Sequence, residues 1–171
     1  MTENESDNQM RMGFLLTKAG VMTEEQVLAV LERQKASAEL FGMIAQEMYG
    51  ITDKQIWMAY AEQMIGFCVE SSLPLQERDT HTLRHIPLRD AWRFQILPLR
   101  YEEDGESLVC ATTREKFANA LAYANNHLGQ FFVQYILVDK RELEQEIMQL
   151  NEKIKLAKEQ KQAREQAAYA G

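Results

Sequence analysis

The sequence predicts an α+β protein whose first half is helical and whose second half is mixed. Residues 11–34 and 40–63 are two copies of one helical pattern, related without a gap by a shift of 29 positions, from 11 to 40. After residue 66 the pattern changes to short apolar runs separated by turn residues, which is typical of strands that alternate with helices. These two observations favour a four-helix, two-repeat module followed by a small three-stranded sheet with helices on one face and a long C-terminal helix.

Local signals in the first copy indicate how each repeat folds. A short apolar helix is expected over residues 13–19, and Gly20 stands where a helix end uses the left-handed conformation that glycine adopts most easily. Thr23 and Gln26 then form a capping box that begins a second helix. Thr52 takes the place of Thr23 in the second copy. Repeats of this kind bury their apolar faces against each other.

The second half predicts strands and helices in alternation. The expected elements are, in order, a short strand that follows Gly66, a short helix over 80–85, a strand over 95–101, a hairpin turn at Asp104–Gly105, a strand over 107–112, a helix over 116–127, a strand over 131–138 and a final helix capped by Asp139. The expected organisation is a disordered tail at 1–10, the helical module at 11–66, a small α/β sandwich at 67–150 and an extended helical tail at 151–171.

The final helix carries an apolar seam with two possible meanings. Its members, Leu143, Ile147, Leu150, Ile154 and Ala157, recur at four-three-four-three spacing over about two heptads. The seam is expected either to pair with a second copy in a homo-oligomer, or to pack on the sheet for its first half and fray after it. From Lys158 the composition keeps strong helix propensity but has little to bury.

Charge, cysteine content and hydropathy exclude several classes of protein. The 171 residues carry a net charge of −7, which argues against nonspecific nucleic-acid binding. Cys68 and Cys110 stand in apolar surroundings and indicate reduced thiols of a cytoplasmic protein. No apolar run is long enough to span a membrane, and no signal peptide precedes the repeat.

Motifs that carry chemistry are missing from the sequence. It contains no phosphate-binding loop, dinucleotide cradle, nucleophile elbow or Cys-x2-Cys pair, so we expect no enzymatic activity and no cofactor. His81 and His85 stand four apart, but without the three or four convergent ligands that a metal requires.

The repeat resembles the MshEN-type N-terminal domain of type II secretion and type IV pilus assembly ATPases. The resemblance depends on Arg11, Gly13, Leu16, Gly20, Val27, Leu31 and Gln34, and on the five-residue spacer that follows them. The second copy keeps Gly42, Ile56 and Gln63 but has Leu40, Ala45 and Tyr49 where the family has Arg, Leu and Gly. The second half is similar to the second part of the type II secretion ATPase N-terminal domain, although residues 111–114 replace its usual turn.

This resemblance implies a regulatory or adaptor domain that binds cyclic di-GMP. The residues it implies for the ligand are Arg11, Met12, Gly13, Leu16, Gly20, Leu31, Gln34, Gly42 and Gln63. It also implies docking to the cytoplasmic region of an inner-membrane secretion or pilus protein, or to a partner ATPase. The alternative is a docking or scaffold module with a degenerate nucleotide site that associates through its final helix. Residue 40 discriminates between the two interpretations. A site for the doubly anionic ligand favours a cation at this position, whereas a docking surface does not require one.

Two further groups of residues are candidates for binding a protein. Arg84, Arg89, Arg93 and Arg100 concentrate positive charge, either to dock an acidic partner or as a solvated face. Trp57, Met58 and Tyr60 lie near Met43, Met48 and Met64, and form either a core or an adaptable docking surface.

Overall fold

A computed structural model describes residues 11–71, 78–103 and 105–169. The expected tail at 1–10, the end of the helical tail at 170–171 and Asp104 of the predicted turn lie outside the described residues. The α+β class is confirmed, because helices and one sheet share the chain. The chain divides into two compact units, Met1–Phe67 and Cys68–Gly171.

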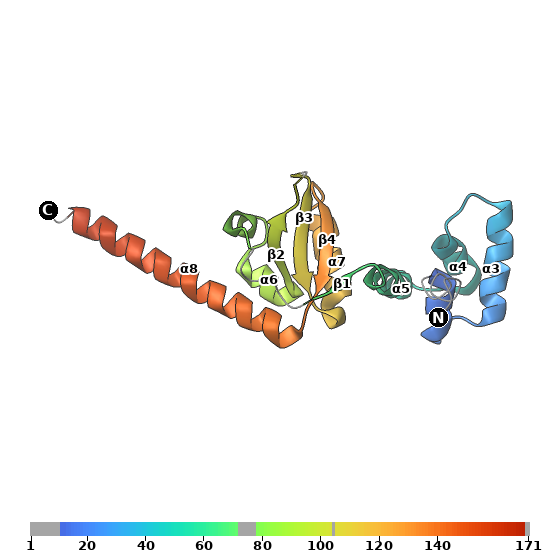
Figure 1. Cartoon of the computed structure of the whole chain (residues 1–171). Helices are drawn as coiled ribbons and strands as arrows, with labels where there is room; N and C mark the ends of the chain where they lie inside the picture. The colour runs from blue at the N-terminus through green and yellow to red at the C-terminus, as the bar shows by residue number, and fades with distance from the viewer. Residues whose placement is uncertain (1–10, 72–77, 104, 170–171) are drawn as a thin grey trace. The chain divides into compact units, whose positions relative to one another are not determined.

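The first unit consists of four helices, α2 (Met12–Lys18), α3 (Glu24–Ala36), α4 (Phe41–Tyr49) and α5 (Asp53–Ile65), shown in blue to green in Figure 1. Both predicted capping boxes are present, with Thr23 accepting from the Gln26 amide and Thr52 from the Gln55 amide. Helix α2 packs mainly against α5, and α3 against α4. The first helix of each copy therefore packs on the second helix of the other copy, and their apolar faces meet in one core.

The second unit is built on a sheet of four strands rather than three. The strands are β1 (Val69–Glu70), β2 (Ile96–Tyr101), β3 (Ser107–Thr112) and β4 (Phe132–Leu137), in the order β1-β4-β3-β2. β2 and β3 form an antiparallel hairpin, while β4 runs parallel to β3 and β1. The short strand expected after Gly66 is present as β1, but the sequence assigned only three strands to the sheet, because two residues are too few to indicate that they pair with β4.

Helices cover the sheet and close the core of the second unit. They are α6 (Leu88–Phe94), α7 (Phe117–His127) and α8 (Lys140–Tyr169), with the 3-10 turns η2 (Thr80–Arg84) and η3 (Arg114–Lys116). All six residues of β3 are buried, so both faces of this central strand are covered. The sequence missed α6, because seven residues after Pro87 are too few to show a helical period.

The final helix follows the packing alternative over its first half. Asp139 accepts hydrogen bonds from the amides of Arg141 and Glu142 and so begins α8 as predicted. Leu143, Ile147 and Leu150 are buried in the core of the second unit. From residue 151 to 167, the described side chains of α8 are exposed except for the half-buried Ile154. The first half of the seam is therefore already covered by the unit's own core.

Candidate functional site

The repeat is preserved in the packing of the first unit as well as in its sequence. Gly13 of α2 lies against Val27 of α3, and a Cβ at Gly13 would come within 2.6 Å of the Val27 Cγ1. Gly42 of α4 makes the equivalent contact with Ile56 of α5, where a Cβ would lie 3.2 Å from Cγ2. Both glycines therefore let the two helices of one copy approach closely.

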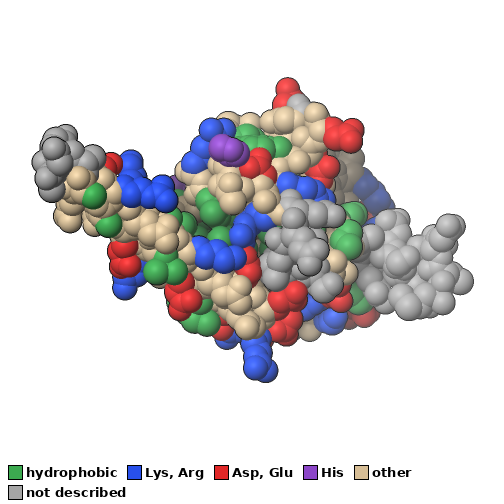
Figure 2. Space-filling view, turned by 60° about the vertical axis from the view of Figure 1, so that its left-hand side comes forward, with side chains coloured by type: hydrophobic (Ala, Val, Ile, Leu, Met, Phe, Trp, Pro, Cys, Tyr) green, Lys and Arg blue, Asp and Glu red, His purple; other side chains and the backbone are tan. Residues whose placement is uncertain are grey.

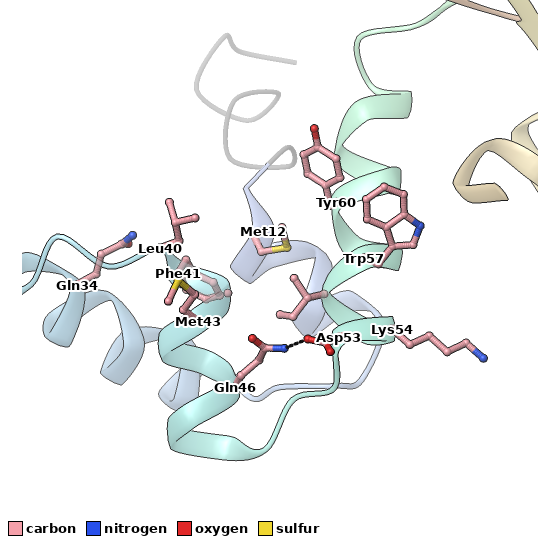
Figure 3. A pocket seen from close by; sticks show the side chains of 12 residues that line it. Met12, Gln34, Leu40, Phe41, Met43, Gln46, Asp53, Lys54, Trp57 and Tyr60 are labelled. Carbon is pink, nitrogen blue, oxygen red and sulfur yellow. Dashed lines mark hydrogen bonds between the residues drawn. The ribbon is translucent and has the colours of Figure 1, made fainter. Parts of the chain in front are cut away.

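A cavity of about 900 Å³ lies on the first unit and is lined mainly by residues of the second copy. Its lining consists of Met12, Gln34, Leu40, Phe41, Gly42, Met43, Gln46, Asp53, Lys54, Ile56, Trp57 and Tyr60. Helices α4 and α5 supply most of these side chains, while α2 supplies Met12 and α3 supplies Gln34 (Figure 3). The cavity is thus formed where the two copies meet, and its size is typical of small-molecule sites.

The lining is mostly apolar, with a few polar groups around it. The Gln46 amide nitrogen donates to the Asp53 carboxylate at 2.5 Å, which joins α4 to the first turn of α5. The Gln34 amide nitrogen donates to the Glu39 backbone carbonyl at 3.2 Å and holds the linker between the copies. Lys54 extends away from the other lining side chains in Figure 3. Trp57 and Tyr60 present aromatic rings whose centroids are 5.7 Å apart.

The residues that the resemblance implied for a ligand divide into three groups. Met12, Gln34 and Gly42 line the cavity. Leu16 is 1% exposed within the core, and Gly20 adopts φ 69° in the turn after α2. The remaining four, Arg11, Gly13, Leu31 and Gln63, are the repeat equivalents of Leu40, Gly42, Tyr60 and Gln34 in the lining. Only three of the nine implied residues therefore line the cavity.

Leu40 lines the cavity and is the repeat equivalent of Arg11 in the first copy. Arg11 is the N-cap residue of α2, and Leu40 is the N-cap residue of α4 with 70% of its surface exposed. Arg11 is itself exposed and directly precedes the lining residue Met12. The start of α4 therefore contributes an alkyl side chain to the cavity wall, where the equivalent start of α2 carries a cation.

Several lining residues were not part of the implied ligand set. Met43, Trp57 and Tyr60 are the repeat equivalents of Phe14, Leu28 and Leu31, and most of these six apolar side chains are exposed. The sequence left Met43, Trp57 and Tyr60 open between a core and a docking surface. In the structure Met43 and Tyr60 are exposed, and Trp57 is half-buried. Their shared spacing from the two glycines was the signal that could have assigned them to one face.

An ion pair ties the two copies together near this site. Arg33 of α3 donates to the Glu47 carboxylate of α4 at 2.6 Å. The hydrogen bond and charge of Glu47 raise the pKa of Arg33 above its ordinary value. Both side chains are exposed, so we expect this pair to orient α3 and α4 with only a small effect on stability.

The other candidates from the sequence lie in different surroundings. Nowhere in the described residues do three or more His, Cys, Asp or Glu side chains converge to hold a metal. The His85 Nε2 lies 2.6 Å from the Tyr101 hydroxyl, and its ring packs on Phe131. Within the described ranges, no helix is both long and apolar enough to cross a membrane.

Comparison with known proteins finds likenesses among solved structures only. No family model matches the sequence, and no curated protein matches it. Among the solved structures that are similar to this chain is MshE with cdg, at 19% sequence identity and a TM-score of 0.42. The match covers 81% of this chain and 97% of that chain.

Proposed function

We propose that this chain is a non-catalytic regulatory or adaptor protein that binds cyclic di-GMP in the cavity of the second repeat. The observation that carries the proposal is the convergence of Met12, Gln34 and Gly42 in one cavity. These residues come from three helices and belong to the set that the family resemblance implied. A cavity between two copies of one motif also suits a ligand built from two identical halves.

The chemistry of the lining supports a base-containing ligand. Trp57 and Tyr60 offer aromatic faces for stacking a guanine, and the amides of Gln34 and Gln46 can bond its edge. The phosphates would find a cation in Arg11, which directly precedes the lining residue Met12. Because Leu40 supplies no charge, we expect weaker binding than two Arg side chains would give.

Titration calorimetry of the full chain with cyclic di-GMP tests this proposal. We expect heat of binding that Arg11→Ala and Gln34→Ala each reduce severalfold or more. Lys18→Ala is the matched control, because Lys18 is a cation at the other end of the same helix and does not line the cavity. No heat at high ligand concentration would exclude the proposal. Binding that is unchanged in both Arg11→Ala and Gln34→Ala would exclude it as well.

Fluorescence provides a second measurement at the site itself. The chain contains two tryptophans, so the variant Trp92→Phe leaves Trp57 of the cavity as the reporter. A ligand that stacks on or beside Trp57 should change its emission with the same affinity as the calorimetry. Calorimetric binding without any change in Trp57 emission would place the ligand elsewhere on the chain.

A second candidate function is docking of a protein on the first unit. The observation that favours it is that both copies expose apolar side chains at equivalent positions. Leu28 of the first copy is 62% exposed, and Met43 of the second copy is 56% exposed. Large exposed apolar surfaces on a folded module are typical of interaction sites. A cytoplasmic segment of an inner-membrane secretion or pilus protein, or a partner ATPase, is the candidate partner. Leu28→Glu should then abolish capture of that partner while leaving the calorimetry with cyclic di-GMP unchanged.

A further inference from the structure

A shallow groove of about 440 Å³ lies between α6 and α8 of the second unit, remote in sequence from the cavity of the repeat. Its lining residues are Leu88, Arg89, Trp92, Ile147, Met148 and Asn151. Trp92 is 45% exposed and Met148 is 52% exposed, although both are large apolar side chains. The groove therefore leaves a tryptophan and a methionine in contact with water.

The packing of the two helices explains why these side chains are exposed. Ala91 of α6 and Ile147 of α8 turn into the core of the second unit and are almost completely buried. Trp92 and Met148 are their immediate neighbours in sequence, and neighbours on a helix point about 100° apart. The core thus fixes the positions of both helices, and the groove needs no rearrangement to present its apolar side chains.

Arg side chains border this groove on α6, while Glu144 and Glu152 of α8 stand four residues before and after Met148. Arg89 has 90% of its side chain exposed, and Arg93 follows four residues later on the same face of α6. The Arg89 Nε contacts the Asp90 carboxylate at 3.4 Å, and the Arg93 guanidinium lies 5.2 Å from the centre of the Phe94 ring. The described lining of the groove contains no carboxylate. On the face drawn in Figure 2, hydrophobic side chains lie beside Lys and Arg side chains, with Asp and Glu side chains among them.

We propose that this groove binds an acidic amphipathic helical segment of a protein partner. The apolar stripe of such a segment would cover Trp92 and Met148, while its carboxylates would accept hydrogen bonds from Arg89 and Arg93. Trp and Arg are the side chains that most often dominate the binding energy of an interface, and here they stand three residues apart on one helix. The proposal concerns a different unit from the nucleotide cavity and does not depend on it.

Charge also argues against a second copy of α8 as the occupant. The exposed part of α8 carries more cations than carboxylates, namely Lys153, Lys155, Lys158, Lys161 and Arg164 against Glu152, Glu159 and Glu165. Seating this segment in the groove would bring cations to Arg89 and Arg93. The charges of Arg89 and Arg93 therefore favour an acidic partner over a second copy of α8.

A peptide selection on the full chain tests the proposal. Short helical peptides with a fixed apolar stripe and randomised Asp, Glu, Lys, Arg and Ser on the flanks would be displayed and selected for binding. We expect enrichment of Asp and Glu, with binding by the enriched peptides lost in Trp92→Ala and weakened at least tenfold in Arg89→Glu. Arg141→Glu is the matched control, because Arg141 is an exposed cation of α8 outside the groove. Circular dichroism would verify that each variant is folded.

Other outcomes of the same experiment would overturn the proposal. Enrichment of neutral or basic flanks would do so, as would acidic peptides whose affinity is unchanged in Trp92→Ala. The full chain would also be tested against vesicles containing phosphatidylserine and against a single-stranded oligonucleotide. Binding to either of these that Arg89→Glu abolishes, without selection of acidic peptides, would assign the groove to a membrane surface or a nucleic acid instead.

Discussion

At the scale of single residues, the two repeat-related glycines serve packing before they serve any ligand. Gly13 is buried beside Val27, and Gly42 stands beside Ile56 in the wall of the cavity. The two glycines are conserved between the copies, but Arg11 and Leu40 are not. These two residues are the N-caps of equivalent helices, and one is cationic while the other is apolar. The start of α2 thus carries a cation, whereas the equivalent start of α4 carries an alkyl side chain in the cavity wall.

Restoring the missing cation should strengthen ligand binding. We expect Leu40→Arg to tighten cyclic di-GMP binding about tenfold or more, because a charge-assisted hydrogen bond contributes about 1.5–3 kcal/mol. Calorimetry at two salt concentrations measures the gain, which should shrink as salt rises. Leu40→Met is the control for side-chain length without charge. An affinity equal in Leu40→Arg and Leu40→Met would contradict the assignment of the ligand to this cavity.

The tight contact at Gly13 predicts unequal effects for one substitution at equivalent positions. Gly13→Ala places a methyl group 2.6 Å from the Val27 Cγ1, and such overpacking costs about 1–3 kcal/mol of stability. Gly42→Ala meets Ile56 at 3.2 Å, and the higher helix propensity of Ala offsets much of that strain. Urea unfolding of both variants measures the difference. A larger loss in Gly42→Ala would show that the two contacts are not as described.

At the scale of elements, a buried ion pair fixes α8 to the segment before η2. Arg78 donates to Glu146, with side-chain exposures of 9% and 5%, and the Arg78 Nε is buried without a partner among the described residues. Removing one member leaves a buried charge unpaired. We therefore expect this pair to determine how firmly the start of α8 is held.

Single and double substitutions separate the effect of this pair from that of a surface pair. Arg78→Met should lower the free energy of unfolding by about 3–5 kcal/mol, and the added change Glu146→Leu should recover most of the loss. Arg114→Met is the matched control, because its pair with Glu70 is exposed and should contribute about 1 kcal/mol or less. Chemical unfolding checks all three. Equal losses for Arg78→Met and Arg114→Met would contradict this account.

The second half of α8 contributes little to stability. Because Leu143, Ile147 and Leu150 are buried before residue 151, a chain that ends at 151 should keep its unfolding free energy within about 0.5 kcal/mol. Only Ile154 and Ala157 remain of the seam for pairing, so sedimentation should give a monomer with or without residues 152–171. A dimer that the truncation abolishes would instead restore the coiled-coil interpretation.

Sequence reasoning succeeded where signals are local and fell short where they depend on packing between elements. Thr23 and Thr52 predicted their helix starts, because a capping box needs only four consecutive residues. The pairing of β1 with β4 depends on residues far apart in the chain. The cavity likewise combines Met12 with Trp57, because α2 and α5 of different copies pack together, and no pattern within one copy records that contact.

At the scale of the whole molecule, the chain consists of two units with separate cores. The core that contains Leu16 and Ile44 belongs to the first unit, and the core that contains Leu97 and Leu143 belongs to the second. No residue is shared between these two clusters in the described parts of the chain. The proposed ligand cavity and the proposed partner groove thus lie on units that each have their own hydrophobic core.

Division into two units predicts that each folds alone. Fragments 1–67 and 68–171 should each give a dispersed amide NMR spectrum. Each core closes within its own unit, so neither should need the other for burial of its apolar surface. Fragment 1–67 should then bind cyclic di-GMP as the full chain does. A collapsed or unfolded spectrum for either fragment would show that stability depends on contact between the units.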